Sequence, residues 1–328
     1  MGLHVGTSGW SYPSGEGRWN GLFYPASRSK RAGTAQFDEL RFYAEHFDTV
    51  EVNSTFYGQP RPDVTRGWVE RTPDGFEFSL KLYQKFTHPK MFKEAALKAT
   101  GGEGGALLDV LAQVTASDID DFKAGIEPLA AAGKLGALLA QFPASFKSSD
   151  ESRDYLTRLL HVFREYPVAV ELRHRSWSDD LGGTLSLLNG FGAAFVQIDE
   201  PKFRLSIRQN YLPNVTGFYY MRLHGRNAAA WWHHEHRDDR YNYLYSAEEL
   251  REFSDVAGAA KDLVKKSYLY TNNHFSAKSV VNAVMLKAQL GQPIEGDYPP
   301  ELVKRYPELA DLVTTEPLPL TEERAGPR

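Results

Sequence analysis

Hydrophobic residues in this chain fall into short runs separated by longer stretches with helical spacing. Eight runs are rich in Val, Leu, Phe and Tyr and end abruptly at polar or Gly residues, which is typical of buried strands. The predicted strands span residues 3–8, 49–53, 76–81, 135–142, 168–173, 193–199, 217–223 and 267–272.

The stretches between these runs predict helices that follow nearly every strand. Apolar residues recur every three or four positions, as at Phe37, Leu40, Ala44 and Phe47. The predicted helices span residues 37–47, 60–71, 118–132, 150–166, 181–189, 247–261 and 276–290. Strands that alternate with helices favour a parallel sheet, and eight strands are the number that closes a (β/α)8 TIM barrel. A doubly wound open sheet is the main alternative, but it needs fewer strands and a Gly-rich phosphate loop that this chain lacks.

The pattern predicts one barrel domain over residues 1–298 and a Pro-rich tail over residues 299–328. No linker divides the chain before the tail. The longest connection follows the third strand, so we expect an insertion there and some irregular or missing helices. Within it, the Gly-rich run 101–105 does not follow a strand and is interpreted as a flexible turn.

Composition excludes some classes of protein but does not indicate a function. The chain has 328 residues, a formal net charge of -4 and no cysteine. The absence of cysteine suits a reducing compartment, and neither a secretory signal nor an apolar run of about 18 residues is visible, so we expect a cytoplasmic protein without membrane association. The acidic balance makes a small ligand a more natural partner than a long nucleic acid, although nucleic acid is not excluded. The oligomeric state is not indicated.

Polar residues stand at the end of every predicted strand. In a (β/α)8 barrel these ends form the face on which chemistry takes place. Charged residues among them include Glu51, Lys81, Glu171, Arg173 and Arg222. Charges near one axis are costly to bury unless they pair with each other or with a ligand. The sequence therefore predicts a site at this face.

The types of side chain suggest a role for each predicted site residue. His224 follows Arg222 on the same face of its strand and can act as a general acid or base, with Glu171 as its partner and Glu51 as an orienting group. Arginine and lysine side chains offer donors to a phosphate or carboxylate, and aromatic rings can stack on a sugar or base. We predict that the substrate-binding residues are Arg222, Arg173, Lys81, Asn53, Asp199, Asn273, Trp10, Tyr57 and Tyr243.

Other interpretations of the same residues stay open. Glu51, Glu171, Asp199 and His224 could hold Mg²⁺, Mn²⁺ or Zn²⁺, although the neighbouring cations nearly match the acids and favour ion pairs over a metal. The cations themselves could receive an anion or form an internal salt-bridge network, and these two interpretations are compatible. Glu51 and Glu171 could instead act as a glycosidase pair. The run His233-His234-Glu235-His236 lacks the spacing of a zinc helix and predicts a solvated loop.

Several motifs, in order along residues 3–290, resemble those of one family. They are Gly6-Thr7-Ser8-Gly9-Trp10, Glu51-Val52-Asn53-Ser54-Thr55-Phe56-Tyr57, residues 78–81 with Thr87-His88, residues 139–143, Glu171-Leu172-Arg173-His174 with Trp177, Arg222-Leu223-His224-Gly225, Tyr243-Leu244-Tyr245-Ser246 with Glu249-Leu250, and Asn272-Asn273 with Asn282-Ala283. With these motifs the chain resembles the YecE-like family, the domain of unknown function 72. The resemblance implies a TIM-barrel fold, in agreement with the strand count, and implies no activity.

These observations together lead to a functional expectation. We expect a hydrolase-like enzyme that acts at the barrel mouth on an anionic, ring-containing small molecule, such as a nucleotide, a nucleic-acid fragment or a sugar phosphate. Cleavage of a phosphoester or glycosyl bond is the favoured reaction class. The alternatives are a ligand-binding or sensor protein without catalysis, and a metal-dependent barrel of the endonuclease or isomerase type.

Overall fold

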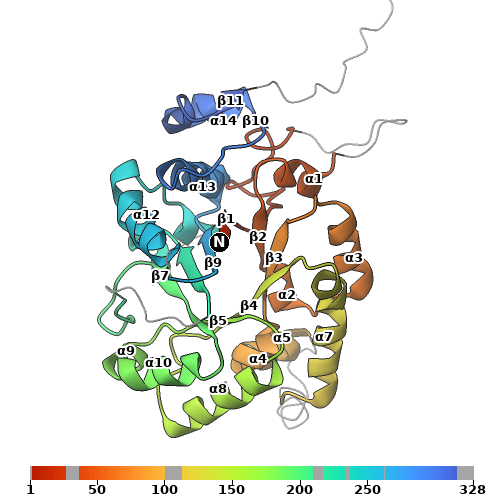
Figure 1. Cartoon of the computed structure of the whole chain (residues 1–328), viewed down its shortest axis with the longest axis vertical. Helices are drawn as coiled ribbons and strands as arrows, with labels where there is room; N and C mark the ends of the chain where they lie inside the picture. Colours follow the sequence, from red (N-terminus) through yellow and green to blue (C-terminus); the bar gives the residue numbers. More distant parts are fainter. Residues whose placement is uncertain are drawn as a thin grey trace, which may run out of the picture.

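Nine parallel strand segments form a nearly closed barrel in the computed structural model, which describes residues 2–26, 37–99, 113–209, 217–232, 237–261 and 263–315 (Figure 1). Their order in the sheet is β6-β5-β4-β3-β2-β1-β9-β8-β7. The segments are β1 (Gly2–Ser8), β2 (Thr49–Val52), β3 (Glu77–Lys81), β4 (Leu135–Gln141), β5 (Val168–Glu171), β6 (Ala194–Phe195), β7 (Gln197–Asp199), β8 (Tyr219–Leu223) and β9 (Lys266–Thr271).

The barrel closes at Val196, which separates β6 from β7. β6 pairs with β5, and β7 pairs with β8. The Val196 amide donates a hydrogen bond of 3.0 Å to Val170 O. Nine segments thus occupy eight strand positions, because the predicted sixth strand is present as two pieces. The prediction of a (β/α)8 barrel is confirmed.

Helices surround the strands, as Figure 1 shows. They are α1 (Glu39–Ala44), α2 (Ser54–Tyr57), α3 (Pro62–Glu70), α4 (Gln84–Thr87), α5 (Pro89–Ala99), α7 (Ala116–Ala131), α8 (Asp150–Val162), α9 (Ser176–Asp179), α10 (Leu181–Asn189), α11 (Ala229–Trp232), η1 (Arg237–Tyr241), α12 (Ala247–Lys261), η2 (Phe275–Ala277) and α13 (Lys278–Gln289). Side chains of Thr115, Ser149 and Asp180 accept hydrogen bonds from the first turns of α7, α8 and α10, which explains where these helices begin.

In the part of the chain that the structure describes, the expected insertion after β3 carries the helices α4, α5 and α7. The Gly-rich run 101–105 and the histidine run 233–236 lie outside the described residues, so their predicted loop structures stay predictions. Across the described part of the chain, no helix has both the length and the apolar character to cross a membrane.

The last described elements pack on the outside of the barrel beside α13 (Figure 1). They are β10 (Asp297–Tyr298), α14 (Pro300–Arg305), η3 (Pro307–Leu309) and β11 (Thr314–Thr315). Tyr298, Leu302 and Leu309 are fully buried. The predicted division at residue 298 stays a prediction, but the residues that follow it are part of the apolar core.

Tyrosine side chains fill much of the barrel interior below the strand ends. The Tyr270 hydroxyl lies 2.6 Å from Thr49 Oγ1 and 2.9 Å from Ser79 Oγ. The rings of Tyr268 and Tyr270 stack with 6.2 Å between their centroids. This layer satisfies its own hydroxyl groups and gives the charged residues above it a rigid support.

Candidate functional site

Strand register decides which polar side chains face the barrel axis. Ser8 aligns with Glu51, Gln141 with Glu171, and Ile198 with Arg222. Aligned residues of neighbouring parallel strands point to the same side of the sheet, and residues two apart on one strand do so as well. Arg222 and His224 therefore face inward with the two glutamates.

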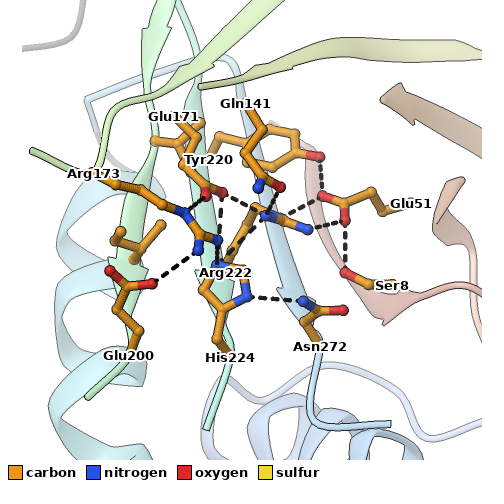
Figure 2. Close-up of polar contacts among 12 residues, drawn as sticks. Ser8, Glu51, Gln141, Glu171, Arg173, Glu200, Tyr220, Arg222, His224 and Asn272 are labelled. Carbon is orange, nitrogen blue, oxygen red and sulfur yellow. Dashed lines mark hydrogen bonds and ion pairs between the residues drawn. The ribbon is translucent and has the colours of Figure 1, made fainter. Parts of the chain in front are cut away.

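Arg222 lies at the centre of the charged layer and is only 1% exposed. Its guanidinium group forms a forked pair with Glu51, with Nε to Oε2 at 2.9 Å and Nη2 to Oε1 at 2.7 Å (Figure 2). Its third nitrogen, Nη1, donates to Glu171 Oε2 at 2.5 Å and to Gln141 Oε1 at 3.1 Å. Arg222 thus joins two buried carboxylates from opposite parts of the barrel.

Glu51 has all its acceptor positions used by protein groups. Besides Arg222, the Ser8 hydroxyl donates to Oε1 at 2.7 Å and the Tyr220 hydroxyl donates to Oε2 at 2.7 Å. Four charge-assisted hydrogen bonds offset the cost of burying this carboxylate. The arrangement suits a group that holds Arg222 in place.

Glu171 is shared between two arginines. Its Oε1 accepts from Arg173 Nε at 2.7 Å, and its Oε2 accepts from Arg222. Burial raises the pKa of Glu171, but the charges of Arg222 and Arg173 outweigh this effect and hold the pKa well below its usual value. Glu171 is therefore ionised at neutral pH. Arg173 also pairs with Glu200, with Nη1 to Oε2 at 3.3 Å (Figure 2).

His224 is buried beside both guanidinium groups. Its Nε2 lies 3.3 Å from Arg173 Nη2, 3.4 Å from Arg222 Nη1 and 3.6 Å from Glu171 Oε2, and its Nδ1 lies 2.8 Å from Asn272 Nδ2 (Figure 2). Burial and the charge of Arg222 lower the pKa of His224 to about 3. The imidazole is therefore neutral at physiological pH.

A cavity of 810 Å³ lies at the carboxyl ends of the strands, next to this charged layer. Arg222, Arg173 and Gln141 contribute to its lining, together with residues from the loops that follow the strands. The loop residues that line it include Tyr12, Asn53, Phe56, Tyr57, His88, Lys147, His174, Glu200, Phe203, Trp231, Arg240, Tyr241, Asn272 and His274.

Lys81 lines the cavity at the end of β3. Its Nζ lies 3.9 Å from the centroid of the Phe56 ring, and none of the carboxylates in the described residues lies within ion-pair distance of it. Burial and the nearby Arg222 charge lower the pKa of Lys81 to about 7. Lys81 therefore titrates near neutral pH, which is unusual for a lysine.

Glu200 brings a carboxyl group to the same cavity from the chain that follows β7. It is buried, and burial raises its pKa above the usual value although the Arg173 charge opposes this. Lys81 and Glu200 are thus both shifted towards their neutral forms. Acid and base groups with shifted pKa values in one cavity are typical of catalytic sites.

The structure brings most of the predicted site residues together. Glu51, Glu171 and His224 form the charged layer with Arg222 and Arg173, and Lys81, Asn53 and Tyr57 line the cavity. The charged layer is itself an internal network of salt bridges, which was one of the interpretations left open by the sequence. Among the described residues, no group of three or more His, Asp or Glu side chains could hold a metal ion.

Four predicted residues lie outside both the charged layer and the cavity lining. Asp199 aligns with Leu223 and faces the helices, where it pairs with Arg226 at 2.8 Å and accepts from the Tyr245 hydroxyl at 2.7 Å. Asn273 follows Asn272 and has the opposite orientation; its Nδ2 donates to Tyr243 O at 2.7 Å. The Tyr243 hydroxyl donates to Glu249, and Trp10 packs edge-on against Trp68.

The main residues that sequence reasoning missed are Glu200 and Asn272. Asp199 and Glu200 are consecutive acids at one strand end, and only one of them can face the axis. Ile198 is aligned with Arg222, so Glu200, two residues later, is the inward one. The strand is buried on both faces, so its sequence alone does not show this orientation.

The charged layer and the cavity occur in a chain with clear relatives. The family model described as a protein of unknown function, DUF72, matches residues 4–304. The UPF0759 protein YunF of Bacillus subtilis is 26% identical over 312 residues, which cover 92% of this chain and 99% of that protein. The UPF0759 protein YecE of Escherichia coli K12 is 28% identical over 176 residues, which cover 52% of this chain and 48% of that protein.

Solved structures show the same fold. A DUF72 family protein of Thermotoga maritima is 32% identical with a TM-score of 0.70, and the match covers 89% of this chain and 100% of that chain. A DUF72 family protein of Enterococcus faecalis is 24% identical with a TM-score of 0.70, over 89% of this chain and 96% of that chain. The fold, the family match over nearly the whole chain and the relatives agree: the chain belongs to the DUF72 family.

Proposed function

We propose that the protein is an enzyme that binds an anionic, ring-containing small molecule in the cavity at the barrel mouth and hydrolyses a phosphoester or glycosyl bond. One observation carries the proposal. The cavity brings together basic side chains, aromatic rings and a single buried carboxyl group among its described lining residues. The substrate classes that fit this chemistry are nucleotides, nucleic-acid fragments and sugar phosphates.

Basic side chains outnumber carboxylates in the described lining of the cavity. Lys147 and Arg240 come from loops at its rim, and Arg173 reaches its floor, whereas Glu200 is the one carboxylate in the described lining. Arginine forks and lysine amines are the groups that bind phosphate and carboxylate in proteins. We assign the anionic part of the ligand to these three residues.

Aromatic side chains offer flat surfaces for the ring of the ligand. Tyr12 stacks on His274 with 4.2 Å between the centroids, and Tyr241 lies against the same imidazole at 4.8 Å. Tyr57 is 49% exposed at the cavity, so its ring is accessible to a ligand. Stacking of a base or sugar on such rings contributes about 1–3 kcal/mol for each contact.

Glu200 is the group we assign to proton transfer. Burial raises its pKa, and a raised pKa suits a carboxyl group to deliver a proton to a leaving oxygen. His224 and Glu171 were the expected pair for this step. Both are buried against guanidinium groups, so we assign them, with Glu51, to the positioning of Arg222 and Arg173.

Binding is tested by thermal unfolding in the presence of inorganic phosphate, ribose 5-phosphate and adenosine 5′-monophosphate. A ligand at one hundred times its dissociation constant adds about 2.7 kcal/mol of stability, so Tm rises. Lys147→Ala reduces the rise, whereas Lys304→Ala, on the exposed side of α14, leaves it unchanged. Absence of a rise with every one of these ligands contradicts the proposed site.

Catalysis is tested with sugar phosphates and nucleoside 5′-monophosphates as substrates, by following inorganic phosphate and free base. We expect Glu200→Gln to lower kcat by about a hundredfold or more and to retain ligand binding. The exposed Glu301→Gln serves as the control. A ligand that raises Tm but is never converted by the unmodified protein contradicts the hydrolytic activity and favours the sensor alternative.

A further inference from the structure

The amine of Lys81 lies in the cavity in surroundings that the binding of an anion alone does not explain. The Thr55 hydroxyl donates to Lys81 O at 2.6 Å and fixes the end of β3, and the face of Phe56 lies under Nζ. No carboxylate of the described chain reaches this amine, although three buried glutamates lie in the same region. Those glutamates are instead bound to Arg222 and Arg173.

We propose that Lys81 is a nucleophile that forms an imine with an aldehyde or ketone carrying an anionic group. This inference rests on the anion-binding cavity proposed above and adds a class of substrate to it. Open-chain sugar phosphates have this chemistry, because opening of the sugar ring exposes a carbonyl group. The rim cations Lys147 and Arg240 receive the phosphate, and the carbonyl carbon points towards the floor, where Lys81 lies.

The surroundings of Lys81 keep part of its amine unprotonated. Burial and two neighbouring guanidinium groups, those of Arg222 and Arg173, disfavour the ammonium form and place the pKa at about 7. A lysine next to other cations in a buried pocket is an activated nucleophile. At pH 7, roughly a thousandfold more of this side chain is free amine than of an ordinary lysine.

The reaction balances with groups that face the cavity. The nitrogen lone pair of Lys81 attacks the carbonyl carbon, a C–N bond forms, and the carbonyl oxygen takes up a proton to give a carbinolamine. Loss of that hydroxyl group as water, with the remaining nitrogen proton, gives the C=N bond. Glu200 is the cavity carboxyl group that can deliver a proton to the oxygen and recover one from the nitrogen, so no further reactant is needed.

The test uses the full-length protein, glyceraldehyde 3-phosphate as the probe and cyanoborohydride to reduce any imine to a stable secondary amine. Peptide mapping by mass spectrometry then locates the adduct. We expect one main adduct on Lys81 at pH 7, formed at least tenfold faster than adducts on exposed lysines, with a rate that is half-maximal near pH 7. Lys81→Arg keeps the charge and removes the adduct, and Lys304→Ala retains it.

The outcomes separate this inference from the proposed function. Labelling spread over exposed lysines, or a Tm rise with inorganic phosphate but no adduct on Lys81, overturns the imine and leaves the anion site standing. Equal labelling by glyceraldehyde without phosphate supports the imine and contradicts the anion site. The peptide map of the unmodified protein decides the question even if the Arg variant does not fold.

Discussion

Arg222 is the buried cation that pairs with both glutamates of the charged layer. Its guanidinium group contacts Glu51 and Glu171, and the three side chains are at most 1% exposed. Removal of one partner from such a cluster leaves uncompensated charge in a medium of low dielectric constant. Arg226 provides a comparison, because its pair with Asp199 lies at the outer side of the sheet and Arg226 is 31% exposed.

Arg222→Ala is expected to lower the free energy of unfolding by about 3–5 kcal/mol, because it strands two buried carboxylates. Arg226→Ala is expected to cost less, about 1–3 kcal/mol, because it leaves one buried carboxylate, Asp199, which keeps its hydrogen bond from the Tyr245 hydroxyl. Urea unfolding of both variants measures the difference. Equal losses would show that the central layer is more hydrated than the geometry indicates.

His224 makes stability depend on pH in a defined direction. The unfolded chain protonates this histidine near its ordinary pKa of about 6.5, whereas the folded protein does so only near pH 3. The stability it contributes is therefore complete above pH 6.5 and is lost as the pH falls towards 3. His224→Asn should flatten the slope of unfolding free energy between pH 5 and 6.5 by up to about 1.4 kcal/mol per pH unit.

His161→Asn, on the exposed side of α8, is the control and should leave that slope unchanged. The level of stability can differ between the variants without affecting the test, because only the slope reports the proton. An unchanged slope in His224→Asn would mean that the imidazole is already protonated in the folded protein at mildly acidic pH.

At the scale of residues, the sequence predicted which charged side chains stand at the strand ends. It did not predict which of them face the barrel axis and which face the helices. Residues such as Glu51, Glu171 and Arg222 stand out because charge is rare in apolar strands. Asp199 and Asn273 stand out equally, yet both face the helices, because each lies one residue away from an inward position. The orientation depends on register, which is set by the neighbouring strands and is not written in one strand.

At the scale of elements, the end of β8 depends on a backbone turn at Gly225. Its φ is +92°, in the region that favours glycine, and its amide donates to the Tyr245 hydroxyl at 2.8 Å. A Cβ atom at this position would lie 2.8 Å from Tyr243 Cβ. The turn therefore brings the loop after β8 against the charged layer without steric conflict.

Gly225→Ala should destabilise the protein more than Gly192→Ala does. Both positions have positive φ, which costs about 1–2 kcal/mol for alanine. A Cβ at Gly192 meets no atom within 4 Å, so only Gly225→Ala adds a clash, for about 1–3 kcal/mol more. Chemical unfolding of the two variants isolates the steric part, and equal effects would argue against the close packing of Tyr243.

Periodicity predicted the elements well where one face is apolar over its full length. The predicted bounds 181–189 and 247–261 are those of α10 and α12. Periodicity did not predict the break at Val196 or the short helices α2, α4 and α9. A four-residue element is too short to show a hydrophobic period, and its formation depends on contacts with neighbouring strands.

At the scale of the whole molecule, closure of the barrel creates the site. Glu51, Glu171 and Arg222 lie far apart in sequence, on β2, β5 and β8, and meet because the ring of strands is small enough for their side chains to touch at its centre. The count of eight strands predicted this convergence. The cavity above it depends on loop conformations, for which the sequence has no periodic signal.

A substitution in the C-terminal elements can test whether the whole chain folds as one unit. Leu302 of α14 is fully buried, so Leu302→Ala should cost about 2–5 kcal/mol, whereas Leu263→Ala, at a position 67% exposed, should change stability by less than about 0.5 kcal/mol. β5 lies on the side of the barrel far from α14 (Figure 1). Hydrogen exchange of β5 therefore shows whether the loss of stability extends to the far side of the barrel. One cooperative unit requires that Leu302→Ala lower protection in β5 as much as in α14. Loss confined to α14 and η3 would instead support the predicted boundary at residue 298, with the tail as a separable element on a complete barrel.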